Sequence, residues 1–489
     1  MKYSKSILTL TALASLISGC MVGPNYQTPA TPVTSVSSQA YTAEPLLLSA
    51  DQRVHMGQQI SAAWWTLYRS PQLDRLIQQA LAHNLDIAAA KASMAQANDL
   101  LAAERGTLLP QVGLNATSGR QKYGAALFGP ANFTIPPFSY DELGPSLSWT
   151  PDLFGGTRRG IERQQALAAY QAHQLDAAYV TLTGNVVAQA LAIAATQAEI
   201  DITQQILTED EKTLKLMQNA LTGGSGTRTE VLSAQSQLDA DRTLLPPLQQ
   251  RLSVARHALA ILTGVAPADW QTTDLRLGQL TLPVDLPVSL PSELVRQRPD
   301  ILAAEANLHA ASAAIGVATA NLYPKLTLTA NFMQEALNPA GLLKVANGAW
   351  ALAGGLSAPL FNGGTLSAQK RAAEHAYQAA LAQYQQTILQ SFGQVADQLQ
   401  ALQHDGERIA AEQQAVTTAA ASLDLARRSY AAGNTGVLPI VDAERLLAHA
   451  QLELNRAQSQ RFLDTAQLYV ALGGSPLAAE EKGTQVNVR

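Results

Sequence analysis

Residues 388–402, ILQSFGQVADQLQAL, lie within a segment, Thr365–Ala432, that contains no proline and has glycine only at Gly393 and Gly406. The segment is rich in Ala, Gln, Leu and Glu, and a single helix of this length would reach roughly 100 Å. Its apolar positions alternate at spacings of four and three: Ile388, Phe392, Val395, Leu399 and Leu402. This spacing is typical of a coiled-coil seam, so we expect a rod packed along neighbouring helices rather than a compact globule.

The rod ends in a tight turn. Its last residues are Tyr430-Ala-Ala-Gly-Asn-Thr-Gly436, where Gly433 suits the left-handed position that follows a helix. A second helix should begin near Pro439 and carry Asp442 in its first turn, where proline and a carboxylate are both favoured. The sequence therefore predicts a helical hairpin.

The same hairpin occurs earlier in the chain. Residues 220–235 match residues 429–444 at an offset of about 209, with Gly224 on Gly433. Further matches keep this order: Asn84–Ile87 with Arg298–Ile301, Leu109-Pro110 with Tyr323-Pro324, Asp152–Gly156 with Phe361–Gly364, and Leu262–Gly264 with Leu472–Gly474. The chain is thus a tandem duplication of a unit of about 210 residues, too long for a solenoid repeat.

Each copy combines helices with two segments of alternating polarity. In the first copy we expect helix over 72–108 with an interruption at Asn84 and Asp86, a rod over 157–221, and a return helix over 230–262 broken at Pro246-Pro247. The second copy should open with a helix over 294–322. Strands are expected at about 110–119, 142–150, 325–333 and 349–358. In the third of these, Leu326, Leu328, Ala330 and Phe332 all fall on one face.

The strands have two explanations. They could belong to a soluble sheet with one face on a core, but every flanking segment is a rod-like helix that supplies no such core. Alternatively, the apolar face meets lipid, as in a transmembrane barrel, whose strands need about 9 to 11 residues. We find no stretch of the mature chain long and apolar enough for a spanning helix. Four strands cannot close a barrel; two chains give about 8 strands and three give about 12, which leaves room for a pore.

The first residues read as an export signal. Lys2 and Lys5 precede an apolar core over 7–17, and the segment ends in Leu16-Ile-Ser-Gly-Cys20, which resembles the bacterial lipoprotein box. Cys20 is the only cysteine, so we expect a lipid on it rather than a disulfide; the alternative is an ordinary signal peptide. Met21 in place of an aspartate favours the outer membrane.

The expected domain organisation follows from these features. It comprises a signal peptide (1–19), a lipidated extended linker (20–60), repeat 1 (61–264), an inter-repeat linker (265–291), repeat 2 (292–474) and a flexible tail (475–489). The net charge of -5 gives no basic footprint, so nucleic acid is an improbable partner. No catalytic or metal motif is present: there is no HExxH, no Walker loop, and Gly223–Gly226 lacks the lysine of a phosphate loop.

Over its mature length the chain resembles the TolC family of outer-membrane efflux channels, and within it the lipoprotein branch that serves resistance-nodulation-division pumps. The features that carry the resemblance are Cys20–Tyr26, Trp64-Trp65, Pro71-x-Leu73, Asn84-x-Asp86, the two Leu-Phe-Gly-Gly-like turns, and Tyr430-x-x-Gly433 followed by Asp442-Ala443. The resemblance implies a mainly α fold with transmembrane β structure: a homotrimer with a shared barrel of about 12 strands and a periplasmic α-barrel. It also implies a periplasmic adaptor and an inner-membrane pump as partners.

The resemblance further implies a gate at the tip of the second hairpin. Leu438 and Asp442 match its apolar and acidic ring positions, and Tyr430 with Glu230 match positions that link neighbouring subunits in some members. From spacing alone, Leu438 could equally be seam packing and Asp442 a helix N-terminal carboxylate. The chain departs from better known members at Thr435, where an arginine joins the links, and at Pro439, where a second acidic ring can stand.

Three classes of function were weighed. A passive export duct in the cell outer membrane, carrying drugs or other toxic small molecules, fits the strands and the hairpins together. A periplasmic adaptor or structural coiled-coil lipoprotein would share the lipid box but should lack paired amphipathic strands in both repeats. A lipid-anchored enzyme would need a catalytic constellation, and we identify none, nor any cofactor beyond the lipid on Cys20.

Overall fold

The computed structural model describes residues 21–30, 40–42, 48, 51–124, 135–271 and 274–474. The expected signal peptide, the lipidation site at Cys20 and the expected tail lie outside these residues. The chain divides into two compact units. The first contains Ser93–Gln171, Ala304–Tyr384 and the N-terminal segment up to Pro29; the second contains Ala30–Ala92, Ala172–Ala303 and the chain from Gln385.

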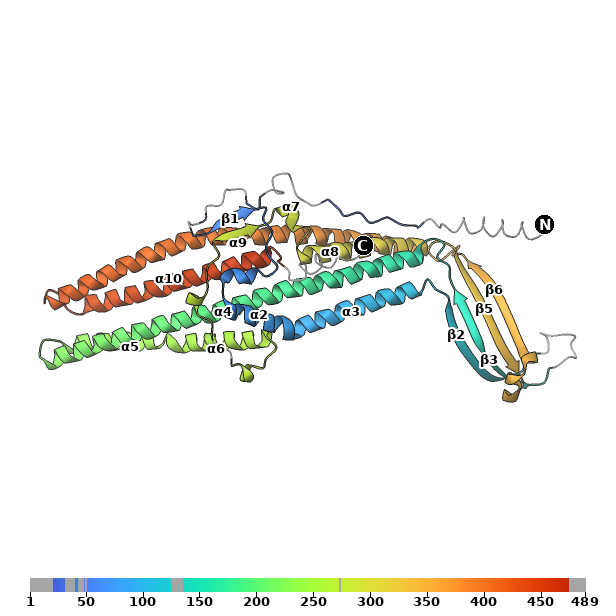
Figure 1. The fold of residues 1–489 in the computed structure, drawn as a ribbon, viewed down its shortest axis with the longest axis horizontal. Coiled ribbons are helices and arrows are strands. Elements are labelled where there is room, and N and C mark those ends of the chain that lie inside the picture. The colour runs from blue at the N-terminus through green and yellow to red at the C-terminus, as the bar shows by residue number, and fades with distance from the viewer. Residues whose placement is uncertain are drawn as a thin grey trace. The chain divides into compact units, whose positions relative to one another are not determined.

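The first unit holds a four-stranded antiparallel sheet, whose strands lie side by side in Figure 1. In spatial order they are β2 (Gln111–Gln121), β3 (Phe138–Trp149), β5 (Lys325–Ala336) and β6 (Gly348–Ser357). All four were predicted from the alternation of polarity, and their observed bounds differ from the expected ones by at most four residues. β3 pairs with β5, so the two repeats form one continuous sheet.

One face of this sheet is apolar and uncovered. The register places Val112 opposite Leu147, Leu147 opposite Ala330 and Ala330 opposite Leu352, so these side chains form one row across the sheet. Val112 is 71% exposed and Leu352 is 75% exposed. Within the described residues no core covers this face. The soluble-sheet explanation is therefore wrong, and the face suits contact with lipid.

Long helices join the sheet at one end of its strands. α3 (Leu85–Gly106) leads into β2, and α4 (Gly156–Thr222) follows β3. In the second repeat α8 (Pro299–Ala320) leads into β5, and α9 (Thr365–Ala431) follows β6. The opposite end of the sheet carries only the loops between β2 and β3 and between β5 and β6.

The N-terminal segment is fastened to the first unit. Arg159 of α4 is 1% exposed, and its guanidinium donates to the carbonyl oxygens of Val22 and Gly23 and to Asn25 Oδ1, at 3.2, 3.3 and 2.7 Å. Tyr26 stacks on His309 with ring centroids 4.2 Å apart. The residues that follow Cys20 thus have a fixed position on α4 and α8.

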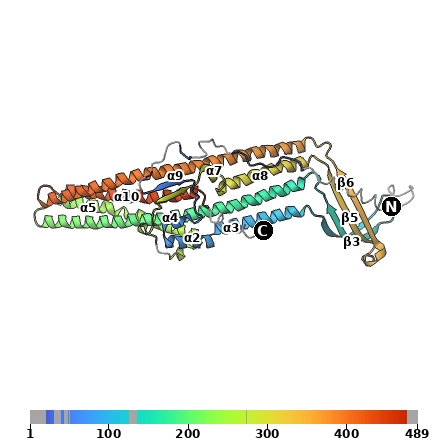
Figure 2. The ribbon, with the colours of Figure 1, turned by 45° about the horizontal axis from the view of Figure 1, so that its top comes forward.

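The second unit contains the two hairpins. Figures 1 and 2 both show α4 beside α5 (Arg228–Arg242) and α9 beside α10 (Leu438–Ala471). The first return helix is broken before α6 (Leu245–Leu262), because its two prolines occupy the first turn of that helix. At the tips Gly224 and Gly433 have φ of 78° and 74°, the left-handed conformation expected of them.

The predicted seams form the core of the hairpins. Ile388, Val395 and Leu399 are buried on α9, and Val187 and Leu191 are buried on α4. A second part of the core comes from the 3-10 helix η1 (Trp64–Tyr68) and α2 (Pro71–His83). Trp64 packs on Tyr469 of α10 at a ring distance of 5.5 Å, and the Tyr68 hydroxyl donates to the Phe462 carbonyl oxygen at 2.9 Å. The Trp64-Trp65 motif thus has a structural role, because it packs this segment against α10.

The duplicated Asn84/Arg298 position has the same task in both repeats. Asn84 Nδ2 donates to the carbonyl oxygen of Leu262, the last residue of α6, at 3.0 Å. Arg298 Nη1 donates to the carbonyl oxygen of Ala471, the last residue of α10, at 2.6 Å. Each therefore caps the return helix of its own repeat. By this contact, Leu262 of the first repeat is equivalent to Ala471 of the second. The sequence match pairs Leu262 with Leu472, the next residue.

Both linkers contain regular structure that was not expected. β1 (Arg53–Met56) and β4 (Asp285–Val288) form a two-stranded parallel sheet. The inter-repeat segment also forms η2 (Pro267–Asp269) and η3 (Leu277–Gln279), and α7 (Pro291–Leu294) follows. The expectation of a plain extended linker over 20–60 and a loop over 265–291 is therefore wrong. Leu286 and Val288 are fully buried, and pairing with β1 satisfies the backbone of the buried strand that carries them.

The interruption expected at Asn84 within 72–108 separates two helices, because the Asn84 side chain accepts hydrogen bonds from the Asp86 and Ile87 amides and caps the start of α3. One further expectation needs correction. The helices α4 and α8 are each long and apolar enough to cross a membrane by length and composition. The statement that no such stretch exists is therefore wrong. The apolar window of α4 is 61% buried inside the structure, which accounts for its composition.

Candidate gate at the hairpin tips

The two hairpin tips of one chain pack on a shared apolar cluster. It joins buried residues of both hairpins: Met217, Ala234, Leu423, Ala426, Val437, Ile440 and Ala443. Tyr430 and Val231 pack against its edge. The tips of the first and second repeats therefore move together unless this cluster opens.

Leu438 and Asp442 lie outside this cluster. They are one helical turn apart at the start of α10, whereas Val437 and Ile440 face inward. Leu438 is 54% exposed, and the Asp442 side chain is 70% exposed with Arg445 at 3.8 Å. Leu438 is thus not seam packing within its own chain. Both side chains are available to a surface beyond this chain, as ring positions require.

Glu230 is held within its own chain. Its carboxylate accepts the Thr227 amide at 2.7 Å and the Thr227 hydroxyl at 3.0 Å, completing a capping box at the start of α5. These bonds, and the backbone of Val437 on the other tip, lower the pKa of Glu230. The two hydrogen bonds of the Glu230 side chain are thus made within the first tip. Its expected link to a neighbouring subunit stays a prediction.

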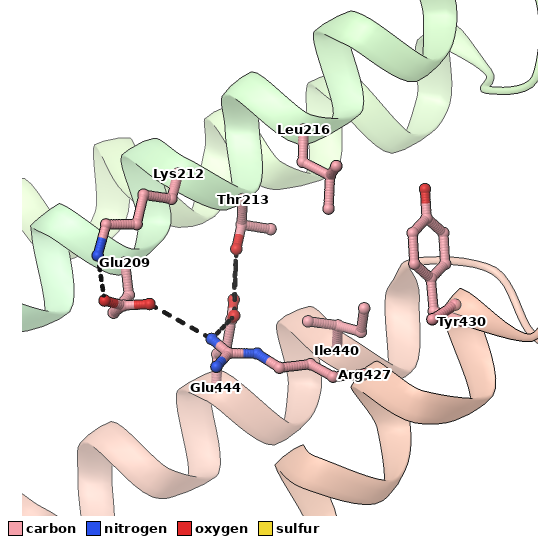
Figure 3. A pocket seen from close by; sticks show the side chains of 9 residues that line it. Glu209, Lys212, Thr213, Leu216, Arg427, Tyr430, Ile440 and Glu444 are labelled. Carbon is pink, nitrogen blue, oxygen red and sulfur yellow. Dashed lines mark hydrogen bonds and ion pairs between the residues drawn. The ribbon is translucent and has the colours of Figure 1, made fainter.

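Tyr430 lines a groove of about 440 Å³ between α4 and the second hairpin, shown in Figure 3. The groove has an apolar half, formed by Leu216, Ile440 and the Tyr430 ring, and a charged half around Glu209 and Glu444. Thr435, which stands where better known members have arginine, has its hydroxyl 3.1 Å from that of Ser429. This hydrogen bond is formed within the tip of the second hairpin.

Sequence reasoning missed the polar bonds that cross this groove. Glu444 of α10 accepts Arg427 Nη2 at 2.9 Å and the Thr213 hydroxyl at 3.1 Å. Arg427 also reaches Glu209 of α4 at 3.4 Å, and Lys212 lowers the Glu209 pKa by donating a hydrogen bond to it. Because these residues come from three helices, only their register in space brings them together.

The Glu444 bonds predict a measurable effect on the tips. Replacing Glu444 by glutamine should lower the free energy that holds the two tips together by about 2 kcal/mol. The reason is that the acceptor of two hydrogen bonds, a largely buried carboxylate, becomes a neutral amide. Hydrogen exchange of amides over 214–234 should then become faster. The control is Glu412→Gln, whose carboxylate lies 4.0 Å from Arg408 and takes part in this one ion pair, away from the tips. Equal exchange in the two variants would show that Glu444 does not hold the tips.

A buried carboxyl pair lies between the two helices of each hairpin. Asp210 of α4 is paired with Asp241 of α5, and Asp405 of α9 with Asp464 of α10. Burial, and then the neighbouring carboxylate, raise the pKa of Asp210 to about 7 and that of Asp405 to about 7.

The arrangement of donors is the same in both pairs. Gln237 and Gln460, each one turn before the return-helix aspartate, donate to Asp241 at 2.8 Å and to Asp464 at 2.9 Å. Among the described residues, Asp210 Oδ2 and Asp405 Oδ2 have no other donor. A proton shared within each pair would satisfy both carboxyls, as the raised pKa values favour.

In the described part of the chain, candidate metal ligands do not cluster. Among the described residues, no three His, Cys, Asp or Glu side chains gather where they could hold a metal ion. The tip instead offers exposed apolar and acidic positions on a bundle whose sheet has an apolar outer face. That combination suits a passage that opens and closes.

Comparison with known proteins agrees with this geometry. A family model described as outer membrane efflux protein matches residues 76–265 and 290–474. The pyoverdine export outer membrane protein OpmQ of Pseudomonas putida is 33% identical over 84% of this chain and 87% of its own length. The cation efflux system protein CusC of Escherichia coli is 30% identical over 94% and 97%.

Solved structures give the same result for the fold. The outer-membrane channel OprN superposes with a TM-score of 0.85 at 27% identity, covering 93% of this chain and 99% of that one. The MtrE outer membrane channel of Neisseria gonorrhoeae, crystallised in an open state, gives a TM-score of 0.81 at 26% identity, covering 93% and 98%.

Proposed function

Because the chain belongs to the outer membrane efflux protein family, we propose that three copies of it form one passive export channel. The chain is an outer-membrane component of efflux systems, spanning that membrane with its sheet and extending long helices into the periplasm. In the proposed trimer a barrel of about 12 strands leads into a tunnel of helices. The observation that supports the trimer most directly is a sheet with an apolar face and two unpaired edge strands, β2 and β6.

The strand directions support closure by copies of the same chain. All neighbouring strands of the sheet are antiparallel. Because two strands, β3 and β5, lie between the edge strands, β2 and β6 run in opposite directions. A neighbouring copy can therefore place its β2 beside β6 without breaking the alternation. An open edge in hydrocarbon would leave backbone groups unpaired, which strongly favours closure.

The partners and the anchor are part of the same proposal. An inner-membrane pump of the resistance-nodulation-division type, with a periplasmic adaptor, supplies the energy and the cargo of drugs or other toxic small molecules. Cys20 carries a lipid, and the Arg159 contacts to residues 22–25 hold the chain just after it. The channel itself uses no cofactor and catalyses no reaction. An adaptor role is disfavoured by paired amphipathic strands in both repeats.

The gate in this proposal is a ring of three Leu438 and three Asp442 side chains at the periplasmic tip. Tyr430 and Glu230 link neighbouring subunits beside it. With Thr435 bonded within its own hairpin and Pro439 in place of an acid, the closed state depends on fewer polar links between subunits.

Cross-linking tests the trimer. Asn115→Cys on β2 and Ala353→Cys on β6 place thiols near the two edges, on the polar face. Within one chain they are three strand spacings apart across the sheet and four residues apart along it, about 20 Å in all, so a bis-maleimide spanning about 8 Å can join them only between chains. We expect a ladder of bands that ends at the trimer. Asn115→Cys alone is the control, and a product that stays monomeric would contradict the shared barrel.

A further inference from the structure

The loop between β5 and β6 lies at the end of the sheet away from the long helices (Figure 1), and it exposes three apolar side chains. It consists of two 3-10 turns, η4 (Pro339–Leu343) and η5 (Val345–Asn347). Leu337 is 70% exposed, and Leu343 and Val345 are each 91% exposed. Apolar side chains grouped in this way on a surface mark a site of interaction.

The loop has a defined conformation. Asn338 Oδ1 accepts the Gly341 amide at 3.1 Å, and Asn347 Nδ2 donates to the Gly341 carbonyl oxygen at 2.8 Å. The Lys344 amide donates to the same oxygen at 3.1 Å. The exposed side chains therefore project from a hydrogen-bonded backbone, and little additional ordering is needed for them to bind a surface.

The loop lies on the apolar side of the sheet. Ala336, at the end of β5, is on the same face as Phe332 and Ala330, because side chains alternate along a strand. A Cβ added at Gly341 would come within 2.7 Å of the Ala336 Cβ, so η4 packs directly over that face. The loop thus lies on the same side of the sheet as the apolar face, beyond a polar position at Gln334.

We propose that this loop is a lipid anchor, which inserts Leu343 and Val345 into the outer leaflet of the outer membrane. The helices leave the opposite end of the sheet into the periplasm, so the loop is at the level of the outer leaflet. Lys344, between the two apolar residues, places its ammonium group against the phosphates of the anionic outer-leaflet lipid. The inference depends on the membrane position of the sheet, and it is independent of the gate.

Spin labelling of the full-length channel tests the anchor. A nitroxide on Leu343→Cys, in vesicles of phosphatidylethanolamine and lipopolysaccharide, should collide readily with oxygen and rarely with a water-soluble nickel chelate. Leu352→Cys, exposed on the apolar face, is the control for lipid contact, and Thr329→Cys on the polar face is the control for water. We expect Leu343→Cys to resemble the lipid control, and Val345→Cys to do the same.

Two results would overturn the proposal. Nickel accessibility equal to that of Thr329→Cys would place the loop in water. Dipolar broadening between labels on Leu343→Cys would show that the loops of several copies meet over the pore instead. Since Leu343 is 91% exposed, its replacement removes no core contact and should not prevent folding. A failure of Leu352→Cys to contact lipid would instead contradict the barrel.

Discussion

Replacing Leu438 and Asp442 together by alanine should raise the single-channel conductance in planar bilayers about tenfold. A tenfold change corresponds to lowering the barrier to ion passage by about 1.4 kcal/mol. Three Leu438 side chains around a threefold axis would expel water from the narrowest point of the pore. Three Asp442 carboxylates one turn away would attract cations and repel anions. Both side chains are exposed and project away from the tip cluster.

Single variants separate the two contributions. Leu438→Ala should account for most of the conductance gain, whereas Asp442→Asn should mainly reduce the preference for cations. Leu389→Ala is the matched control, since Leu389 is 51% exposed on α9 but does not belong to the tip. If the double variant conducts no better than Leu389→Ala, Leu438 and Asp442 are not the gate. The trimer and its barrel would be unaffected by that outcome.

Much of the fold could be predicted because it rests on local periodicity. The seam that includes Ile388 and Val395 and the alternation around Leu326 and Phe332 each fix which face of an element is buried or exposed. The tip glycines could be placed because few other residues adopt positive φ. All of these signals are local: each depends on residues that are close together in the sequence.

The parts that were missed depend on contacts between distant segments. β1 and β4 have four residues each, and only their burial against the rest of the second unit distinguishes them from linker. Arg427 and Glu444 meet across a hairpin, and Thr213 joins them from the other repeat. A periodic pattern carries no information on such registers. The gate residues could be assigned only through family resemblance, since spacing alone left Leu438 ambiguous.

The buried carboxyl pairs were also invisible in the sequence, and they predict how stability depends on pH. An aspartate in the unfolded chain has a pKa of about 4, whereas burial raises that of Asp210 and of Asp405 to about 7. Between these values the folded hairpins hold a proton that the unfolded chain has released. The contribution of each pair to stability should therefore be complete below pH 4 and be lost as pH rises to about 7, by at most on the order of 4 kcal/mol per pair.

The charged neighbours of the two pairs differ. Glu209 and Glu444 face Asp210 and raise its pKa further, whereas Arg461 and Arg408 face Asp405 and lower its pKa. Both carboxyls nevertheless have a pKa of about 7, so the two hairpins should lose this contribution to stability over the same pH range. Hydrogen exchange, corrected for its intrinsic pH dependence, should accelerate in both hairpins as pH is raised from 5 to 8.

Asparagine in place of Asp210 or Asp405 should remove this dependence. An amide at either position donates permanently to Asp241 or Asp464, as the shared proton does, so the variants should unfold at higher urea than the unchanged chain at pH 8 and at similar urea at pH 5. Asp424→Asn is the matched control, because Asp424 is exposed on α9 and pairs with Arg428. Urea unfolding of the detergent-purified chain, followed by helical circular dichroism, measures both. A parallel pH response in Asp405→Asn and Asp424→Asn would mean that no proton is held within the pair.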